Sequence, residues 1–123
     1  MHKFIARKQK MTKSGEMEEV AELLQKYYEQ FKSITGVYSI YLFDPKNKKK
    51  VYKILDDRHN MKKSFKVLKK VAPLFKEDLS MLMGDFDERI FIQKRSDGII
   101  FMLTSNKEVG LGRIFALMKI MEG

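Results

Sequence analysis

The stretch Asp87–Met121, DERIFIQKRSDGIIFMLTSNKEVGLGRIFALMKIM, decides the fold because it predicts strand, tight turn, strand and helix in succession. Alternating apolar residues in Glu88–Lys94 predict a strand. Asp97-Gly98 predicts a hairpin, since Gly98 can adopt the positive φ of a primed two-residue turn. The uniformly apolar Ile99–Leu103 predicts an inner strand covered on both faces. The last segment predicts a helix docked on this hairpin through one apolar face: Leu111, Ile114, Phe115, Met118 and Met121.

Upstream, the chain predicts a long helix followed by two strands. Apolar residues recur every three or four positions between Met17 and Ile34, and Gly36 ends this helix. Val37–Phe43 is rich in β-branched and aromatic residues, which predicts a central strand. Val51–Leu55 predicts its hairpin partner, joined to it through a solvated, lysine-rich loop.

The segment beginning at Met61 predicts a second helix with an unusually wide apolar surface, which Pro73 should kink or end. One sheet covers only one of two adjoining apolar flanks, so this helix should also form a dimer contact. Leu79–Phe86 is ambiguous by period, and we interpret it as a short strand. The predicted dimer interface consists of Met61, Phe65, Val67, Leu68, Val71, Ala72 and Phe75.

These elements predict an α+β fold, in which helices pack on a five-stranded antiparallel sheet. The 123 residues suit one domain, and we interpret residues 1–14 as a flexible basic arm and residues 15–123 as that domain. No apolar run approaches the roughly 20 residues that span a bilayer. Residues 1–14 lack the hydrophobic centre of a secretory signal, and the chain contains no Cys. We therefore expect a cytoplasmic protein.

The net charge of +9 belongs to two segments rather than to the body of the domain. Residues 1–14 and 45–53 each contain five Lys or Arg side chains and no acid. Lysine-rich tracts neutralise phosphates, so nucleic-acid binding is the alternative function, although few aromatic residues accompany these lysines. The candidate contacts are Lys3, Arg7, Lys8, Lys10, Lys13, Lys46, Lys48, Lys49 and Lys50.

Residues that could support catalysis are few. His59 lies beside two aspartates and could act as a base, but a solvated loop cluster is the favoured interpretation. Asp85, Asp87 and Glu88 could bind a divalent cation, yet they lack the spacing of a calcium loop. Gly110-Leu111-Gly112-Arg113 could form an anion site, but close packing of helix on strand better explains both glycines. We predict no catalytic residue, no metal site and no cofactor.

The chain resembles the Roadblock (dynein light chain) family. The matching segments are the helix MEEVAELLQKYYEQF, the strands GVYSIYLFD and KVYKIL, and the closing segment with its N-K-E-V-G-L-G-R run at residues 106–113. The resemblance implies the order α-β-β-α-β-β-β-α and dimers joined through the second helix and the neighbouring strand. It also implies a non-enzymatic protein that binds a protein partner, either as a scaffold or regulator of small Ras-like GTPases or as a motor-associated light chain. The basic arm, the lysine-rich loop and Pro73 depart from the family pattern.

Overall fold

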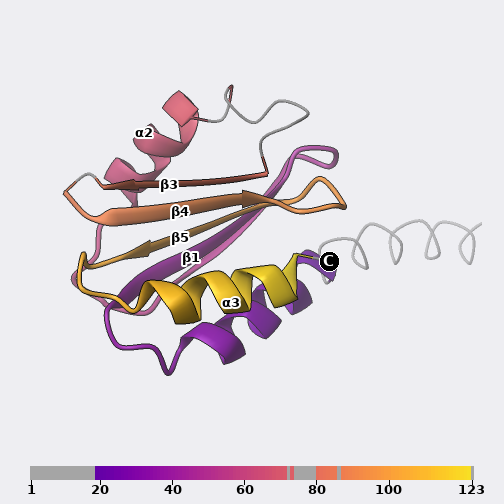
Figure 1. Cartoon of the computed structure of the whole chain (residues 1–123). Coiled ribbons are helices and arrows are strands. Elements are labelled where there is room, and N and C mark those ends of the chain that lie inside the picture. Colours follow the sequence, from indigo (N-terminus) through magenta and orange to yellow (C-terminus); the bar gives the residue numbers. More distant parts are fainter. Residues whose placement is uncertain (1–18, 72, 74–79, 86, 123) are drawn as a thin grey trace, which may run out of the picture.

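The computed structural model describes residues 19–71, 73, 80–85 and 87–122. It has a five-stranded antiparallel sheet between two helical layers (Figure 1). One face of the sheet carries α2 (Met61–Val71). The other carries α3 (Leu111–Met121) and the N-terminal helix, which is described from residue 19 to residue 31. None of the described helices is long and apolar enough to cross a membrane.

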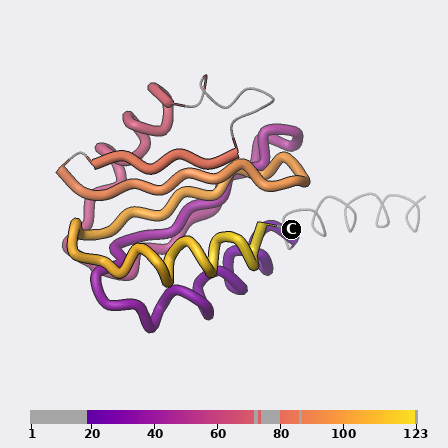
Figure 2. Tube along the Cα trace, in the orientation of Figure 1, coloured from indigo at the N-terminus to yellow at the C-terminus, as the bar shows by residue number. Residues whose placement is uncertain are grey.

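The strands are β1 (Val37–Asp44), β2 (Lys49–Ile54), β3 (Met81–Asp85), β4 (Arg89–Lys94) and β5 (Ile100–Ser105). Their order in the sheet is β2-β1-β5-β4-β3, and all neighbouring pairs are antiparallel. β5 therefore lies at the centre, as its apolar sequence predicts, whereas β2 and β3 form the two edges. Figure 2 shows β3 along one edge of the trace. The predicted α+β class and the order α-β-β-α-β-β-β-α are confirmed.

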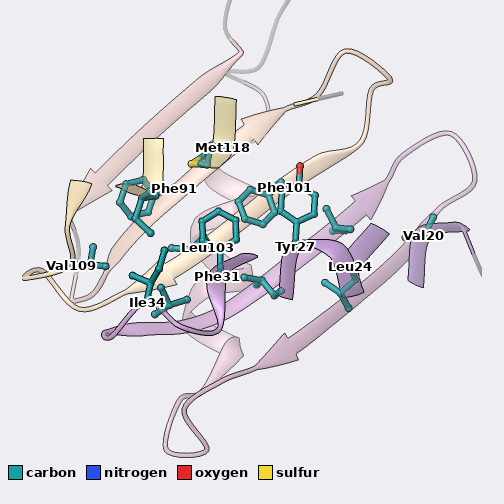
Figure 3. Close-up of a cluster of buried hydrophobic side chains, with 14 residues drawn as sticks. Val20, Leu24, Tyr27, Phe31, Ile34, Phe91, Phe101, Leu103, Val109 and Met118 are labelled. Atoms are coloured by element: carbon teal, nitrogen blue, oxygen red, sulfur yellow. The ribbon is translucent and has the colours of Figure 1, made fainter. Parts of the chain in front are cut away.

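The larger core lies between the sheet and the layer formed by α3 and the N-terminal helix. The ring of Tyr27 stacks on that of Phe101 with centroids 4.2 Å apart, and Phe31 stacks on Phe101 at 5.6 Å (Figure 3). Ile114 and Met118 of α3 are fully buried in the same core. The predicted docking of the C-terminal helix on its own hairpin is confirmed.

A smaller core lies on the opposite face of the sheet, beneath α2. Alternate strand residues supply it: Ile90 and Ile92 of β4 face α2, whereas Phe91 between them faces α3. This alternation follows from the two-residue period of a β-strand. Both faces of the central strands are therefore buried.

The β4–β5 turn differs from the predicted two-residue turn. The Arg95 N–H donates to the Ile99 carbonyl at 2.8 Å, and the Gly98 N–H donates to the Arg95 carbonyl at 3.0 Å. Ser96, Asp97 and Gly98 thus form a three-residue loop. Gly98 has the expected positive φ of 88°, but Asp97 does not share it, as a type I′ turn would require. The hairpin and the role of Gly98 are confirmed, while the two-residue geometry is wrong.

β2 begins two residues earlier than predicted. Lys49 pairs with Asp44 across the hairpin, so Lys49 and Lys50 belong to the strand rather than to the loop. The physical reason is the Asp44 carboxylate, whose Oδ1 accepts hydrogen bonds from the amides of Lys46 at 3.1 Å and Asn47 at 3.4 Å. These hydrogen bonds close the turn early, so Lys49 and Lys50 pair with β1 and extend the ladder.

The glycines at the start of α3 do not pack closely against the sheet. A Cβ at Gly110 or Gly112 would meet no atom within 4 Å, so the close-packing explanation of both glycines is wrong. Gly36 is the constrained glycine instead. It has a φ of 100°, and a Cβ there would lie 2.8 Å from the Asn106 side chain. The Asn106 N–H also donates to the Gly36 carbonyl at 2.9 Å, which holds the two segments together.

Two further predictions concern the segment after β2. α2 stops short of Pro73, as a proline inside the pattern predicts. β3 confirms that the ambiguous Leu79–Phe86 contains a strand, although both end residues of that range lie outside the described part of the chain.

Candidate functional site

α2 buries the centre of its apolar face against its own sheet. Met61, Leu68 and Val71 are buried in the smaller core, together with Tyr41 of β1. Ser64 lies on the same face and is also fully buried, although the apolar pattern does not reveal it. These three apolar positions of the predicted interface therefore already have a partner within the chain.

The flanks of α2 keep part of their apolar surface exposed. Phe65 is partly buried, with its ring edge-on to Tyr41 at 5.3 Å and to Tyr52 at 5.9 Å between centroids. Val67, on the other flank, is partly buried and lines a cleft with Ile90. Ala72 and Phe75 lie outside the described residues. The dimer contact stays a prediction, and within the described part of α2 its accessible apolar residues are Phe65 and Val67.

β3 is an edge strand with apolar side chains on both faces of the sheet. Leu82 packs into the core beneath α2, whereas Met81 packs into the core beneath α3. Met83 is 39% exposed. β3 also contains no lysine, unlike the opposite edge strand β2. Its single charged residue, Asp85, is paired with Arg89, and such an apolar edge is a template for pairing with a further strand.

A buried polar cluster joins the N-terminal end of α2 to the sheet. His59 Nδ1 lies 3.2 Å from Glu88 Oε2, and the Ser64 hydroxyl donates to Glu88 Oε1 at 2.7 Å. His59 Nε2 lies 3.4 Å from the hydroxyl oxygens of both Ser64 and Thr104. The Thr104 hydroxyl in turn shares a 2.6 Å hydrogen bond with that of Ser39. We refer to these five side chains as the His59 cluster.

The interpretation of His59 as part of a solvated loop is wrong. Its side chain is only 5% exposed, and its ring stacks on Tyr38 with centroids 5.6 Å apart. In the sequence, the acids next to His59 are aspartates. In the fold, the acid that contacts His59 is Glu88, and α2 and β3 lie between these two residues along the chain. No local pattern marks this pair, so sequence reasoning had no signal for it.

The His59 cluster contains the residue types of an acid–base–nucleophile arrangement, but not its geometry. A nucleophile must reach a substrate, whereas Ser64 is 0% exposed. Its hydroxyl also donates to Glu88 rather than only facing the imidazole. Buried polar groups that satisfy one another in this way anchor neighbouring elements. The cluster therefore holds α2 against β1 and β5.

A cleft of about 980 Å³ opens beside the His59 cluster, between α2 and the loops at residues 56–60 and 87–88. Two ion pairs lie in its lining: Arg58 Nη2 is 2.9 Å from Asp56 Oδ2, and Lys63 Nζ is 3.2 Å from Asp87 Oδ2. Lys66 also lines the cleft and forms no ion pair with another described residue. Hydrogen bonds from the Arg58 side chain and main chain lower the pKa of Asp56 to about 2. The lining combines three acids with three Lys or Arg side chains, so neither sign of charge dominates the cleft.

The three acids that could have formed a cation site point to three different partners. Arg89 Nε lies 2.6 Å from Asp85 Oδ1, while Asp87 pairs with Lys63 and Glu88 with the His59 cluster. Among the residues that the structure describes, no three His, Cys, Asp or Glu side chains are grouped to hold a metal ion.

Only some of the predicted basic contacts belong to the described residues. Lys46, Lys48 and Lys50 are exposed around the β1–β2 hairpin, and Lys49 is half-buried. None of these four forms an ion pair with another described residue. The cations of residues 1–14 lie outside the described part. Contact with nucleic acid stays a prediction.

No protein-family model and no curated protein sequence matches the chain. Among solved structures, it is similar to the crystal structure of MglC from Myxococcus xanthus, a protein of the Roadblock-like type. The TM-score is 0.53 at 7% sequence identity, and the match covers 83% of this chain and 92% of that one. The chain has a Roadblock-like fold. At this identity, the Roadblock-like similarity concerns the fold alone.

Proposed function

We propose that this chain is a non-catalytic, dimeric Roadblock-like module that binds a protein partner, with a small Ras-like GTPase as the leading candidate. The observation that carries the proposal is the incomplete side of the domain formed by α2 and β3. There, Val67 is only partly buried, and Met83 lies on an edge strand that pairs on one side only among the described strands.

A second copy would complete this side by adding its own β3 to the open edge. Main-chain pairing along β3 would satisfy the N–H and C=O groups that the edge leaves exposed. Completing the burial of Val67 and Met83 would contribute roughly 1 kcal/mol each, since these side chains are already partly covered. The Roadblock resemblance supports a dimer contact through the same elements, because it implies dimers joined through the second helix and its neighbouring strand.

The lysines of α2 oppose this pairing and make it depend on salt. Lys62, Lys63, Lys66, Lys69 and Lys70 are all exposed on the helix. Two copies would bring these like charges together, and salt would screen their repulsion. Long lysine stems can also cover apolar surface while their ammonium groups stay in water. We expect the dimer to become more stable as ionic strength rises.

Sedimentation velocity at micromolar concentration tests the dimer. Val67→Asp and Met83→Asp should shift the wild-type dimer towards monomer by at least tenfold in dissociation constant. Ile120→Asp is the matched control, because Ile120 is 75% exposed on α3, on the other face of the sheet, and should have no effect. A wild-type chain that remains monomeric at both low and high salt would contradict the dimer.

Binding titrations with a panel of small GTPases, each loaded with GDP or a GTP analogue, test the partner. We expect one or more to bind, with affinity that differs between the two nucleotide states. Absence of binding by the whole panel would argue against a GTPase partner while leaving the dimer result intact.

A further inference from the structure

β2 exposes its main chain at the edge of the sheet opposite to β3, and no other described strand pairs with its outer side. The Leu55 N–H donates to the Tyr38 carbonyl at 2.8 Å, and the β1–β2 register places these two residues opposite each other. Bonded and non-bonded pairs alternate along an antiparallel ladder. Lys50, Tyr52 and Ile54 therefore direct their N–H and C=O groups away from β1.

The same three residues also present exposed side chains. Tyr52 is 50% exposed, Ile54 is 43% exposed, and Lys50 is exposed as well. Their neighbour Val51 packs into the core beneath α3, so the alternation of the strand places all three on the α2 face. The same three residues of β2 therefore offer a binding partner both unpaired main-chain groups and exposed side chains.

α2 supplies the other wall of this surface. Phe65 contacts Tyr52 edge-on at 5.9 Å, and Lys62 and Lys69 lie one helical turn to either side of Phe65. Lys50, Lys62 and Lys69 form no ion pair with any other described residue. The result is an apolar centre with a rim of unpaired cations. We name it the basic strip: Lys50, Tyr52, Ile54, Lys62, Phe65 and Lys69.

We propose that the basic strip binds an extended acidic segment of a protein partner, which adds a strand to β2. The main chain of that segment pairs with the free groups of Lys50, Tyr52 and Ile54. Its apolar side chains, at every second position, cover Tyr52 and Ile54. Its carboxylates lie on the same face of the added strand, on either side of the apolar positions, and meet the three unpaired lysines at the rim. This surface lies at the opposite edge of the sheet from β3, and it shares Phe65 of α2 with the dimer interface predicted from the sequence.

The charge of β2 argues against a second copy as the occupant. The strand reads KKVYKI, with three lysines and no acid, so pairing it with itself would oppose like charges across the new ladder. Nucleic acid is also a poor match. Phosphate oxygens only accept hydrogen bonds, which would leave the outward carbonyls of β2 unpaired, whereas a polypeptide strand both donates and accepts.

Fluorescence anisotropy with the full chain and a labelled eight-residue peptide, Glu-Thr-Val-Thr-Val-Thr-Glu-Thr, tests the proposal, because Glu and Val then share one face of the added strand. Two further peptides carry N-methyl groups on alternate residues, one on the Glu and Val set and one on the Thr set. Only one set of amides faces β2 in an added strand, so one N-methylated peptide should lose at least tenfold in affinity and the other should bind nearly as well as the parent. Equal binding by both would overturn strand addition, and no binding of the parent peptide would overturn the proposal.

The protein variants locate the surface. The double variant Lys50→Glu/Tyr52→Glu should weaken peptide binding at least tenfold, whereas Lys119→Glu, which changes an exposed lysine of α3, should change it by less than twofold. Equal loss in both would show that binding follows net charge rather than the basic strip. A single-stranded oligonucleotide that displaces the peptide at lower concentration than the unlabelled peptide would favour nucleic acid instead and overturn the proposal.

Discussion

Glu88→Ala tests whether the His59 cluster holds α2 on the sheet. Glu88 accepts a hydrogen bond from Ser64 and lies against His59, and these two side chains are 0% and 5% exposed respectively. Removing the carboxylate takes the shortest hydrogen bond from Ser64 and the Nδ1 partner from His59, and leaves only the 3.4 Å contacts of His59 Nε2 with Ser64 and Thr104. Each such loss costs roughly 1–3 kcal/mol, so we expect a total of about 2–4 kcal/mol. For a domain of this size, that corresponds to a fall of roughly 8–16 °C in melting temperature.

Calorimetry and guanidinium unfolding measure this loss, and Glu108→Ala is the matched control. Glu108 is exposed, so the same substitution there should change stability by less than about 0.5 kcal/mol. Glu88→Gln keeps one acceptor oxygen for Ser64 and should lose less than Glu88→Ala. Hydrogen exchange adds a local measurement, since the amides of α2 should lose protection more than those of α3. If Glu88→Ala matches Glu108→Ala, the cluster does not anchor α2 and the reasoning fails.

Two further predictions concern the effect of alanine at two glycines and the effect of pH on stability through Tyr27. Gly36→Ala should destabilise the fold by more than about 1 kcal/mol, because the residue has a φ of 100° and its new Cβ would lie 2.8 Å from Asn106. Gly110→Ala should be neutral or slightly stabilising, because its φ of −68° suits any residue and nothing lies within 4 Å; equal melting temperatures for the two variants would refute the contrast. Burial raises the pKa of Tyr27 above its usual value, so the folded state retains this proton at pH values where the unfolded state has lost it. The contribution of Tyr27 to stability is therefore complete below about pH 10 and should decline as pH rises through the folded-state pKa. Tyr27→Phe should flatten that decline in the unfolding free energy, and an unchanged slope would show that other groups cause it.

The elements of the fold could be predicted because each depends on a short-range pattern. The spacing of Ile114 and Met118 marks the buried face of α3, since residues three or four apart share one side of a helix. The apolar run in β5 marks a strand covered on both faces, which is the strand that lies at the centre of the sheet. Local patterns were less informative at turns, where the Asp44 carboxylate decided the start of β2 and the hydrogen bond from Arg95 to Ile99 decided the loop length.

The candidate sites could not be predicted in the same way because they depend on contacts between distant segments. His59 and Glu88 meet only because α2 and β3 fold back between them, and neither residue carries a local signal of the other. The wide apolar surface of α2 was visible in the sequence, but only packing showed that Leu68 is buried while Phe65 retains exposed surface.

The sequence by itself determined the α+β class, the order of the elements and the location of the basic segments, since propensity, periodicity and charge act over neighbouring residues. The tertiary structure alone decided that β2 and β3 are the edge strands, because the order of strands in a sheet is set by long-range pairing that leaves no periodic trace along the chain. The proposed self-association along β3 and the proposed binding of an acidic segment along β2 both depend on that order.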